Sequence, residues 1–148
     1  MPGIYYTPRT KKAMQIAFSI HRDQCDKGGL PYIYHPVHIA EQMDTEDEIC
    51  VALLHDVMED SSMRPEDLRR EGFSDRIITA LLLLTHKENI PYREYIAAIK
   101  TNPLAAKIKL ADLRHNTDIS RLETIDEKVK CRLQKYQESI SLLQEPEK

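Results

Sequence analysis

Apolar residues recur every three or four positions along nearly the whole chain, and this spacing limits the fold more than any other feature. Side chains at this spacing lie on one side of a helix, whereas a half-buried strand needs strict alternation. The only short stretch rich in β-forming residues is 32–34. Two of the helical faces are Ala13, Ile16, Ala17 and Ile20, and Val129, Leu133, Tyr136, Ile140 and Leu143. We therefore predict an all-α fold, a helical bundle of about seven to nine helices.

Capping residues and prolines divide this pattern into separate helices. Ser74 is expected to cap one helix, and Pro65 to begin another that stops at Gly72. The first helix is expected to fray near Asp26, where Gly28 opens a loop. Start signals occur at Thr7-Pro8, Asn89 before Pro91 and Asn102-Pro103, and capping boxes at Thr45 with Glu48 and Thr124 with Glu127. Residues 144–148 are expected to form a tail.

Length and charge exclude several classes of protein. The chain has 148 residues, which predicts one domain over 1–148, too short for a catalytic domain plus a regulatory one. Lysines and arginines number 21 against 24 aspartates and glutamates, and the net charge of −3 argues against a dedicated nucleic-acid binder. The apolar stretches at 49–54 and 80–84 are far shorter than the ~18 residues that span a bilayer. We therefore expect no nucleic-acid partner and no membrane segment.

The N-terminus and the cysteines indicate the compartment. No basic and then apolar segment typical of a secretory signal is visible at the start of the sequence, so we expect a cytoplasmic protein. Cys25, Cys50 and Cys131 are odd in number and never form CxxC, which favours reduced thiols over a disulfide framework or a zinc ribbon. The 4 glycines form no phosphate-binding loop, so any nucleotide must be held in another way.

Ionisable residues interrupt two apolar segments. His55 and Asp56 end a run of mostly apolar residues in a helix expected to continue through Asp56, and Asp112 lies in a similar run. Such groups are costly to bury unless they are paired or bind a metal. With His35 they offer nitrogen and oxygen ligands without thiolate, which suit manganese, iron, magnesium or zinc, and we favour Mn²⁺. The alternative is ordinary core contacts, with His55 hydrogen-bonded and Asp112 paired with Lys109.

Further polar residues lie one helical turn beyond these ligands. Glu59 and Asp60 follow the His-Asp pair by one turn, where a carboxylate can orient a nucleophilic water or move its proton. Their alternative is a solvated acidic helix end. Asn116 lies one turn past Asp112, where it can hold a sugar hydroxyl or a phosphate oxygen or simply end a helix. His115, three residues past Asp112, can contact a metal ligand.

Basic residues flank the proposed ligands in the sequence. A polyphosphate that approaches several carboxylates needs local positive charge. Exposed lysines are also common as purely solvating groups. The flanking cations are Lys27, Lys107, Lys109 and Arg114.

Three segments resemble, in their order and approximate spacing, the RelA/SpoT-type HD-domain hydrolases. They are 29–36 (GLPYIYHP), 52–60 (ALLHDVMED) and 109–116 (KLADLRHN). The resemblance extends over roughly residues 10–122 and is closest in size to the single-domain small alarmone hydrolases.

The resemblance implies an all-helical HD fold with a metal site and a nucleotide substrate. One Mn²⁺, or else Fe²⁺, Mg²⁺ or Zn²⁺, is expected on His35, His55, Asp56 and Asp112. Glu59 and Asp60 are expected to assist a metal-bound hydroxide that attacks phosphorus. The implied substrate is a guanosine tetraphosphate-like nucleotide that loses its 3′-pyrophosphate. Lys27 sits where relatives carry a loop lysine that touches guanine, Asn116 matches their asparagine, and Lys109, Arg114 and Arg22 complete the expected substrate-binding set.

The sequence departs from the family pattern at three places. Asp26 stands where many relatives have an arginine, Leu113-Arg114 reverses their usual order, and residues 117–119 replace a stretch that tends to hold a basic residue and a threonine. These differences leave two alternatives to alarmone hydrolysis: hydrolysis of another phosphorylated nucleotide, and a catalytically weak nucleotide-binding module. The apolar face of the last helix also leaves a homo-oligomer open.

Overall fold

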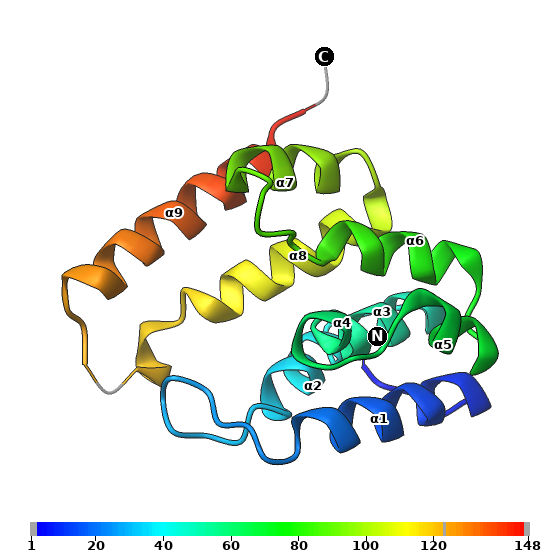
Figure 1. Cartoon of the computed structure of the whole chain (residues 1–148). Helices are drawn as coiled ribbons and strands as arrows, with labels where there is room; N and C mark the ends of the chain where they lie inside the picture. The colour runs from blue at the N-terminus through cyan, green and yellow to red at the C-terminus, as the bar shows by residue number, and fades with distance from the viewer. Residues whose placement is uncertain (1–2, 123, 147–148) are drawn as a thin grey trace.

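The computed structural model describes residues 3–122 and 124–146, and these ranges form helices with no β-strand (Figure 1). Within them there are nine α-helices and one short 3-10 helix, which confirms the predicted all-α fold. The helices are α1 Pro8–His21, α2 Tyr34–Ala40, α3 Glu46–Leu54, α4 Val57–Asp60, α5 Pro65–Arg70, α6 Asp75–Leu84, α7 Tyr92–Lys100, α8 Pro103–Asn116, η1 Ile119–Arg121 and α9 Glu127–Gln144.

Most of the predicted start signals act as expected. The Thr7 side chain accepts from the backbone N–H of Thr10 at the start of α1, and Thr45 with Glu48 forms a capping box on α3. Ser74 and Asn102 cap α6 and α8 in the same way. Local hydrogen bonds of this kind act within four residues, which is why the sequence alone reveals them.

Three predicted boundaries are wrong, each because another local contact takes over. The first helix ends at His21, before Asp26, whose carboxylate accepts from the backbone N–H groups of Gly28 and Leu30 and so stabilises a loop. Asn89 is no cap, because a turn closes from Lys87 to Ile90 and α7 begins after Pro91. At α9, Asp126 caps the N–H of Val129 in place of a box between Thr124 and Glu127. An aspartate two residues further along therefore takes the place of the predicted threonine.

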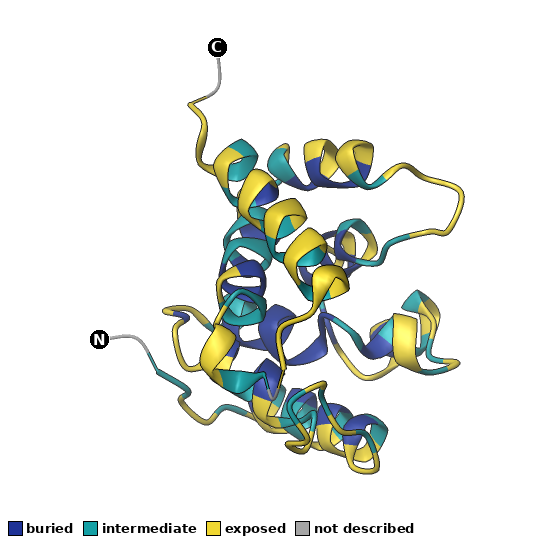
Figure 2. Ribbon diagram, turned by 90° about the vertical axis from the view of Figure 1, so that its left-hand side faces the viewer, coloured by how far each residue is buried: buried dark blue, intermediate teal, exposed yellow. Residues whose placement is uncertain are grey.

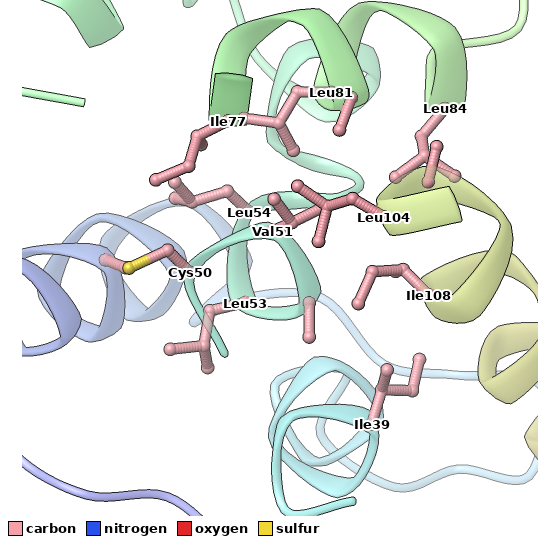
Figure 3. Close-up of a cluster of buried hydrophobic side chains, with 14 of the residues drawn as sticks. Ile39, Cys50, Val51, Leu53, Leu54, Ile77, Leu81, Leu84, Leu104 and Ile108 are labelled. Atoms are coloured by element: carbon pink, nitrogen blue, oxygen red, sulfur yellow. The ribbon is translucent and has the colours of Figure 1, made fainter. Parts of the chain in front are cut away.

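The apolar helix α3 lies at the centre of the bundle, as its sequence predicts. All residues from 49 to 54 are buried, and α3 packs against α1, α2, α6 and α8. In Figure 3, Val51 and Leu54 of α3 lie close to Leu81 of α6 and Leu104 of α8. Cys50 belongs to this core, and burial raises the pKa of its thiol to about 12. The other two cysteines are exposed.

Helix α9 covers the outside of the bundle. It packs against α7 and α8, and Leu142 and Leu143 lie against the buried core. Figure 2 shows its outward side exposed and its inner side partly covered. Of the predicted apolar face, Leu143 packs on the bundle, whereas Val129, Leu133 and Tyr136 line a cavity beside it. Among the described residues, no helix combines the length and the apolarity needed to cross a membrane.

Two neighbouring leucines of α6 provide a test of this packing. Leu81 is fully buried, whereas Leu82 is 46% exposed. Leu81→Ala should lower the free energy of unfolding by about 2–5 kcal/mol, because it removes buried methyl groups and leaves a cavity. Leu82→Ala should change it by no more than about 0.5 kcal/mol. Urea unfolding of both variants measures this difference, and equal effects would contradict the packing described here.

Candidate active site

The structure brings the four predicted metal ligands together from three parts of the chain. His35 lies in the first turn of α2, His55 and Asp56 lie between α3 and α4, and Asp112 lies in α8. The Nε2 atom of His35 is 2.7 Å from Oδ1 of Asp112. The Nε2 atom of His55 is 3.1 Å from Oδ2 of Asp56 and 3.5 Å from Oδ1 of Asp112. Ligand atoms of His35, His55 and Asp56 all lie within 4.8 Å of one another.

A break in the helix places His55 and Asp56 side by side. The prediction of one helix through Asp56 is wrong, because α3 ends at Leu54 and Asp56 has φ −107° and ψ 3°. Successive side chains of a continuous helix point about 100° apart, so two adjacent residues rarely face one point. The Nδ1 atom of His55 contacts the Ala52 carbonyl oxygen at 2.6 Å, which turns Nε2 toward the carboxylates.

The cluster fits a divalent cation. His35, His55 and Asp112 are 3%, 4% and 5% exposed. The Nε2 atom of His55 is buried and has no hydrogen-bond partner among the described residues. A buried imidazole nitrogen that faces two carboxylates is a donor set for manganese, iron, magnesium or zinc. The residues therefore suit an ion at their common centre.

The oppositely charged side chains of this cluster stabilise one another's ionised forms. Burial alone raises the pKa of Asp56, but the neighbouring His55 outweighs it and lowers this pKa to about 2. Burial lowers the pKa of His55, and the charge of Asp56 together with Asp112 raises it above its ordinary value. For Asp112, burial raises the pKa, and the nearby Lys109 ammonium and the two imidazoles bring it well below the usual range.

The ordinary core contacts considered as the alternative to a metal site, a hydrogen bond of His55 and a pair of Asp112 with Lys109, are also present. The ammonium of Lys109 lies 2.9 Å from Oδ2 of Asp112, while Oδ1 faces the imidazoles. Asn116 donates to the same Oδ1 over 3.2 Å. The Tyr32 hydroxyl donates to Asp56, a contact that our sequence analysis missed although Tyr32 lies in the first motif. These hydrogen bonds orient the two carboxylates.

Glu59 and Asp60 lie beside the cluster on the short helix α4. A new turn begins at Asp56, whose carbonyl oxygen accepts from the N–H of Asp60, so the predicted spacing survives the helix break. Glu59 accepts a hydrogen bond from the backbone N–H of His86 over 2.6 Å. The Oδ2 atom of Asp60 lies 3.7 Å from Nδ1 of His21. Burial and the charge of Asp56 raise the pKa of both carboxyl groups. Either group is therefore a better proton acceptor than an exposed carboxylate.

Of the three cavities that residues of the cluster line, two share Asn116 and Tyr136. The larger cavity, of about 340 Å³, is lined among others by Lys27, His35, Asn116, Arg121, Arg132 and Tyr136. The smaller cavity, of about 160 Å³, is lined among others by His55, Asp56, Glu59, His86, Lys109 and Tyr136. Asn116 and Tyr136 border both cavities, so the two adjoin at these residues.

The structure brings only some of the predicted cations to these cavities. Lys27 lines the larger cavity and Lys109 the smaller one. Arg114 is exposed and lines neither, because it lies two residues past Asp112 and thus about 200° around α8. Arg22 also lines neither and pairs with its neighbour Asp23 at the surface. Lys107 binds Asp44 and Glu48 near the start of α3.

Sequence reasoning missed two arginines of the larger cavity. Arg121 pairs with Asp26 over 3.0 Å and donates to the His115 carbonyl oxygen over 2.7 Å. A Cβ atom on Gly28 would collide with the Arg121 carbonyl oxygen, so the loop and η1 touch closely. No local pattern reveals a pair of residues 95 positions apart. Arg132 lies one turn before Tyr136 on α9. The burial of Lys27, together with the charge of Arg132, lowers the pKa of Lys27.

Comparison with known proteins relates the chain to enzymes of alarmone metabolism. A GTP pyrophosphokinase of Streptomyces coelicolor is 33% identical over 119 residues, covering 72% of this chain and 14% of that protein. A guanosine-3′,5′-bis(diphosphate) 3′-pyrophosphohydrolase of Aquifex aeolicus is 33% identical over 121 residues, covering 72% of this chain and 17% of that protein. A solved structure of a metazoan orthologue of SpoT that hydrolyzes ppGpp matches with a TM-score of 0.75 at 21% identity, over 96% of this chain and 89% of that chain.

The sequence matches cover a small part of each relative, whereas the structural match covers nearly the whole chain. No family model matches the chain. The match takes in only 14% and 17% of the length of the two sequence relatives. The structural likeness extends over nearly the whole chain and confirms the fold that the three motifs predict.

Metal binding by the cluster can be measured through stability. At 100 times its dissociation constant, an ion that binds only the folded protein adds about 2.7 kcal/mol to the free energy of unfolding. Added Mn²⁺ should therefore raise the thermal midpoint, and EDTA should reverse the rise. Asp56→Asn should abolish this shift, because it removes a ligand charge from the cluster. Asp23→Asn is the matched control, since that side chain is 93% exposed. An unchanged shift in Asp56→Asn would exclude the cluster as the metal site.

Proposed function

Because the chain is related to the RelA/SpoT-type HD-domain hydrolases, we propose that it is a metal-dependent hydrolase of guanosine tetraphosphate-like alarmones. In this proposal it removes the 3′-pyrophosphate. The observation that carries the proposal is the buried cluster of His35, His55, Asp56 and Asp112, which borders two cavities lined by cations. The proposed setting is the cytoplasm, in keeping with three free cysteines.

The four clustered residues would hold one divalent ion, and we favour Mn²⁺ over Fe²⁺, Mg²⁺ or Zn²⁺. Two imidazoles and two carboxylates provide nitrogen and oxygen ligands without thiolate, and such ligands suit Mn²⁺. A bound divalent ion supplies Lewis acidity, which lowers the pKa of water and stabilises negative charge on phosphate oxygens. The chain's own contribution is to hold the ligands rigidly. Tyr32, Lys109 and Asn116 do so through their hydrogen bonds to Asp56 and Asp112.

Glu59 is the proposed general base. Its carboxylate lines the smaller cavity beside His55 and Asp56, and the backbone N–H of His86 fixes one of its oxygens. Burial raises its pKa, which makes it a stronger acceptor for the proton of an attacking water. Asp60 is assigned a supporting role, because it lies against the buried His21 and is absent from the lining of both cavities.

The nucleotide would occupy the larger cavity and present its 3′-pyrophosphate to the cluster. Lys27 and Arg132 supply positive charge there, and their mutual repulsion is relieved when an anion binds between them. Asn116 borders both cavities and can donate to a sugar or phosphate oxygen. Lys109 provides a buried ammonium in the smaller cavity, where a pyrophosphate carries its charge.

The direct test is release of pyrophosphate. Purified protein with Mn²⁺ should release pyrophosphate from guanosine tetraphosphate, because the proposed ion would lie next to the cavity proposed for the nucleotide. EDTA or Asp56→Asn should abolish the release, and Asp23→Asn should leave it unchanged. Chromatography of the nucleotide and a pyrophosphate assay measure both products of the reaction.

Three results would overturn this proposal in different ways. Turnover that survives EDTA would exclude the metal. Tight nucleotide binding without turnover would favour the binding module. In a panel of phosphorylated nucleotides, a higher kcat/KM for a nucleotide other than guanosine tetraphosphate would assign the enzyme to that substrate.

The role of Glu59 predicts a pH dependence. A general base must be ionised, so kcat/KM should fall as the pH drops through the pKa of Glu59, which lies above the ordinary 4.5. Glu59→Gln should lower kcat by about 10²- to 10⁴-fold and remove this limb of the profile. Mn²⁺ should still stabilise the variant, because Glu59 is no ligand. A profile unchanged in Glu59→Gln would assign the base to another group.

A further inference from the structure

His115 and His35 share a contact between their ring nitrogens. The two Nδ1 atoms lie 2.6 Å apart, and the ring planes differ by 8° with the ring centroids 4.9 Å apart. Nearly coplanar rings that meet edge to edge in this way form a hydrogen bond between the nitrogens. On the opposite edge of His35, Nε2 faces Oδ1 of Asp112 at 2.7 Å. His35 therefore lies between the carboxylate of the cluster and a second imidazole.

Metal binding would decide which nitrogen donates in this contact. Only one proton fits between two nitrogens at hydrogen-bond distance, so one ring must donate and the other accept. When Nε2 of a histidine binds a metal, the remaining proton of the ring sits on Nδ1 and is donated to a neighbouring acceptor. For His35 that neighbour is Nδ1 of His115. The His115 ring must then carry its own proton on Nε2.

We propose that His115 is a positioning residue for the metal centre, whose Nδ1 atom accepts the hydrogen bond from Nδ1 of the ligating His35. This inference rests on the proposed metal-dependent function. The acceptor would hold His35 in the tautomer that exposes the Nε2 lone pair to the ion. It would also fix the rotation of the His35 ring. Without this hydrogen bond, only packing would fix that rotation.

Two contacts hold His115 in place for this role. Its ring stacks on His38 with the centroids 4.1 Å apart, and its backbone carbonyl oxygen accepts from Arg121. His38 lies on α2 together with His35, whereas His115 lies at the end of α8. The contact between the imidazoles therefore also fixes α8 against α2, the two helices that carry Asp112 and His35.

The test measures Zn²⁺ affinity in the absence of nucleotide, by competition with a chelator. His115→Ala should bind Zn²⁺ about 10- to 100-fold more weakly, which is the usual cost of losing the partner of a metal-bound histidine. His115→Asn should recover most of the affinity, because its amide oxygen can occupy the place of Nδ1. Asp23→Asn is the control, because its side chain is 93% exposed and takes no part in the contact between His115 and His35. It should bind within a few-fold of the unmodified protein.

A spectroscopic readout separates positioning from mere folding support. In the Zn²⁺-loaded protein, ¹⁵N NMR should show the His115 proton on Nε2 and the His35 proton on Nδ1. A His115 proton on Nδ1 in that state would overturn the inference, even if His115→Ala failed to fold. Unchanged Zn²⁺ affinity in a folded His115→Ala would overturn it as well.

The outcomes also separate this inference from the proposed function. If the unmodified protein binds no Zn²⁺ or Mn²⁺, both fail together, because neither survives without a metal centre. If it binds Zn²⁺ and hydrolyses guanosine tetraphosphate while His115→Ala keeps full affinity, only the role of His115 fails. If Zn²⁺ binding depends on His115 but no nucleotide is hydrolysed, the positioning role stands and the enzymatic proposal fails.

Discussion

The contact between Asp112 and the imidazoles of His35 and His55 ties together the three helical segments on which the site depends. Its atoms lie 2.7 and 3.5 Å apart, and each of the three residues is at most 5% exposed. Charged groups at such depth destabilise a fold unless each has a partner. Here Lys109 and the two imidazoles provide that compensation for Asp112. A change at any one member would leave an uncompensated charge at the junction of α2, α3 and α8.

The break after Leu54 links this cluster to the hydrophobic core. The six residues before it are buried on all sides, so the backbone enters the cluster from a rigid element. Because the helix stops there, His55 and Asp56 face the same centre, and a new turn then directs Glu59 into the smaller cavity. A continuous helix would have turned one of these two side chains away. The apolar composition of α3 and the irregular backbone after it thus act together.

Much of the fold could be predicted because its signals are local. The caps at Thr45 and Asn102 act within one turn, and the proposed metal ligands in α8 and after α3 are recognisable as ionisable residues in apolar runs. The unpredicted features depend on direction or distance. Arg114 is near Asp112 in sequence but on another side of α8, and the partner of Asp26 is Arg121, 95 residues away. A linear pattern records neither which way an irregular backbone turns nor which distant charges meet.

The long-range pair of Asp26 and Arg121 also explains how an acidic residue can border the larger cavity, where we propose that a nucleotide binds. A bare carboxylate there would repel a polyphosphate. In this structure Oδ1 of Asp26 accepts from the N–H groups of Gly28 and Leu30, and Oδ2 faces the Arg121 guanidinium. The carboxylate is thereby used within the protein, and its charge is offset where it stands. The departure from the family pattern at this position changes how the loop is held, while Lys27 and Arg132 keep the cavity attractive to an anion.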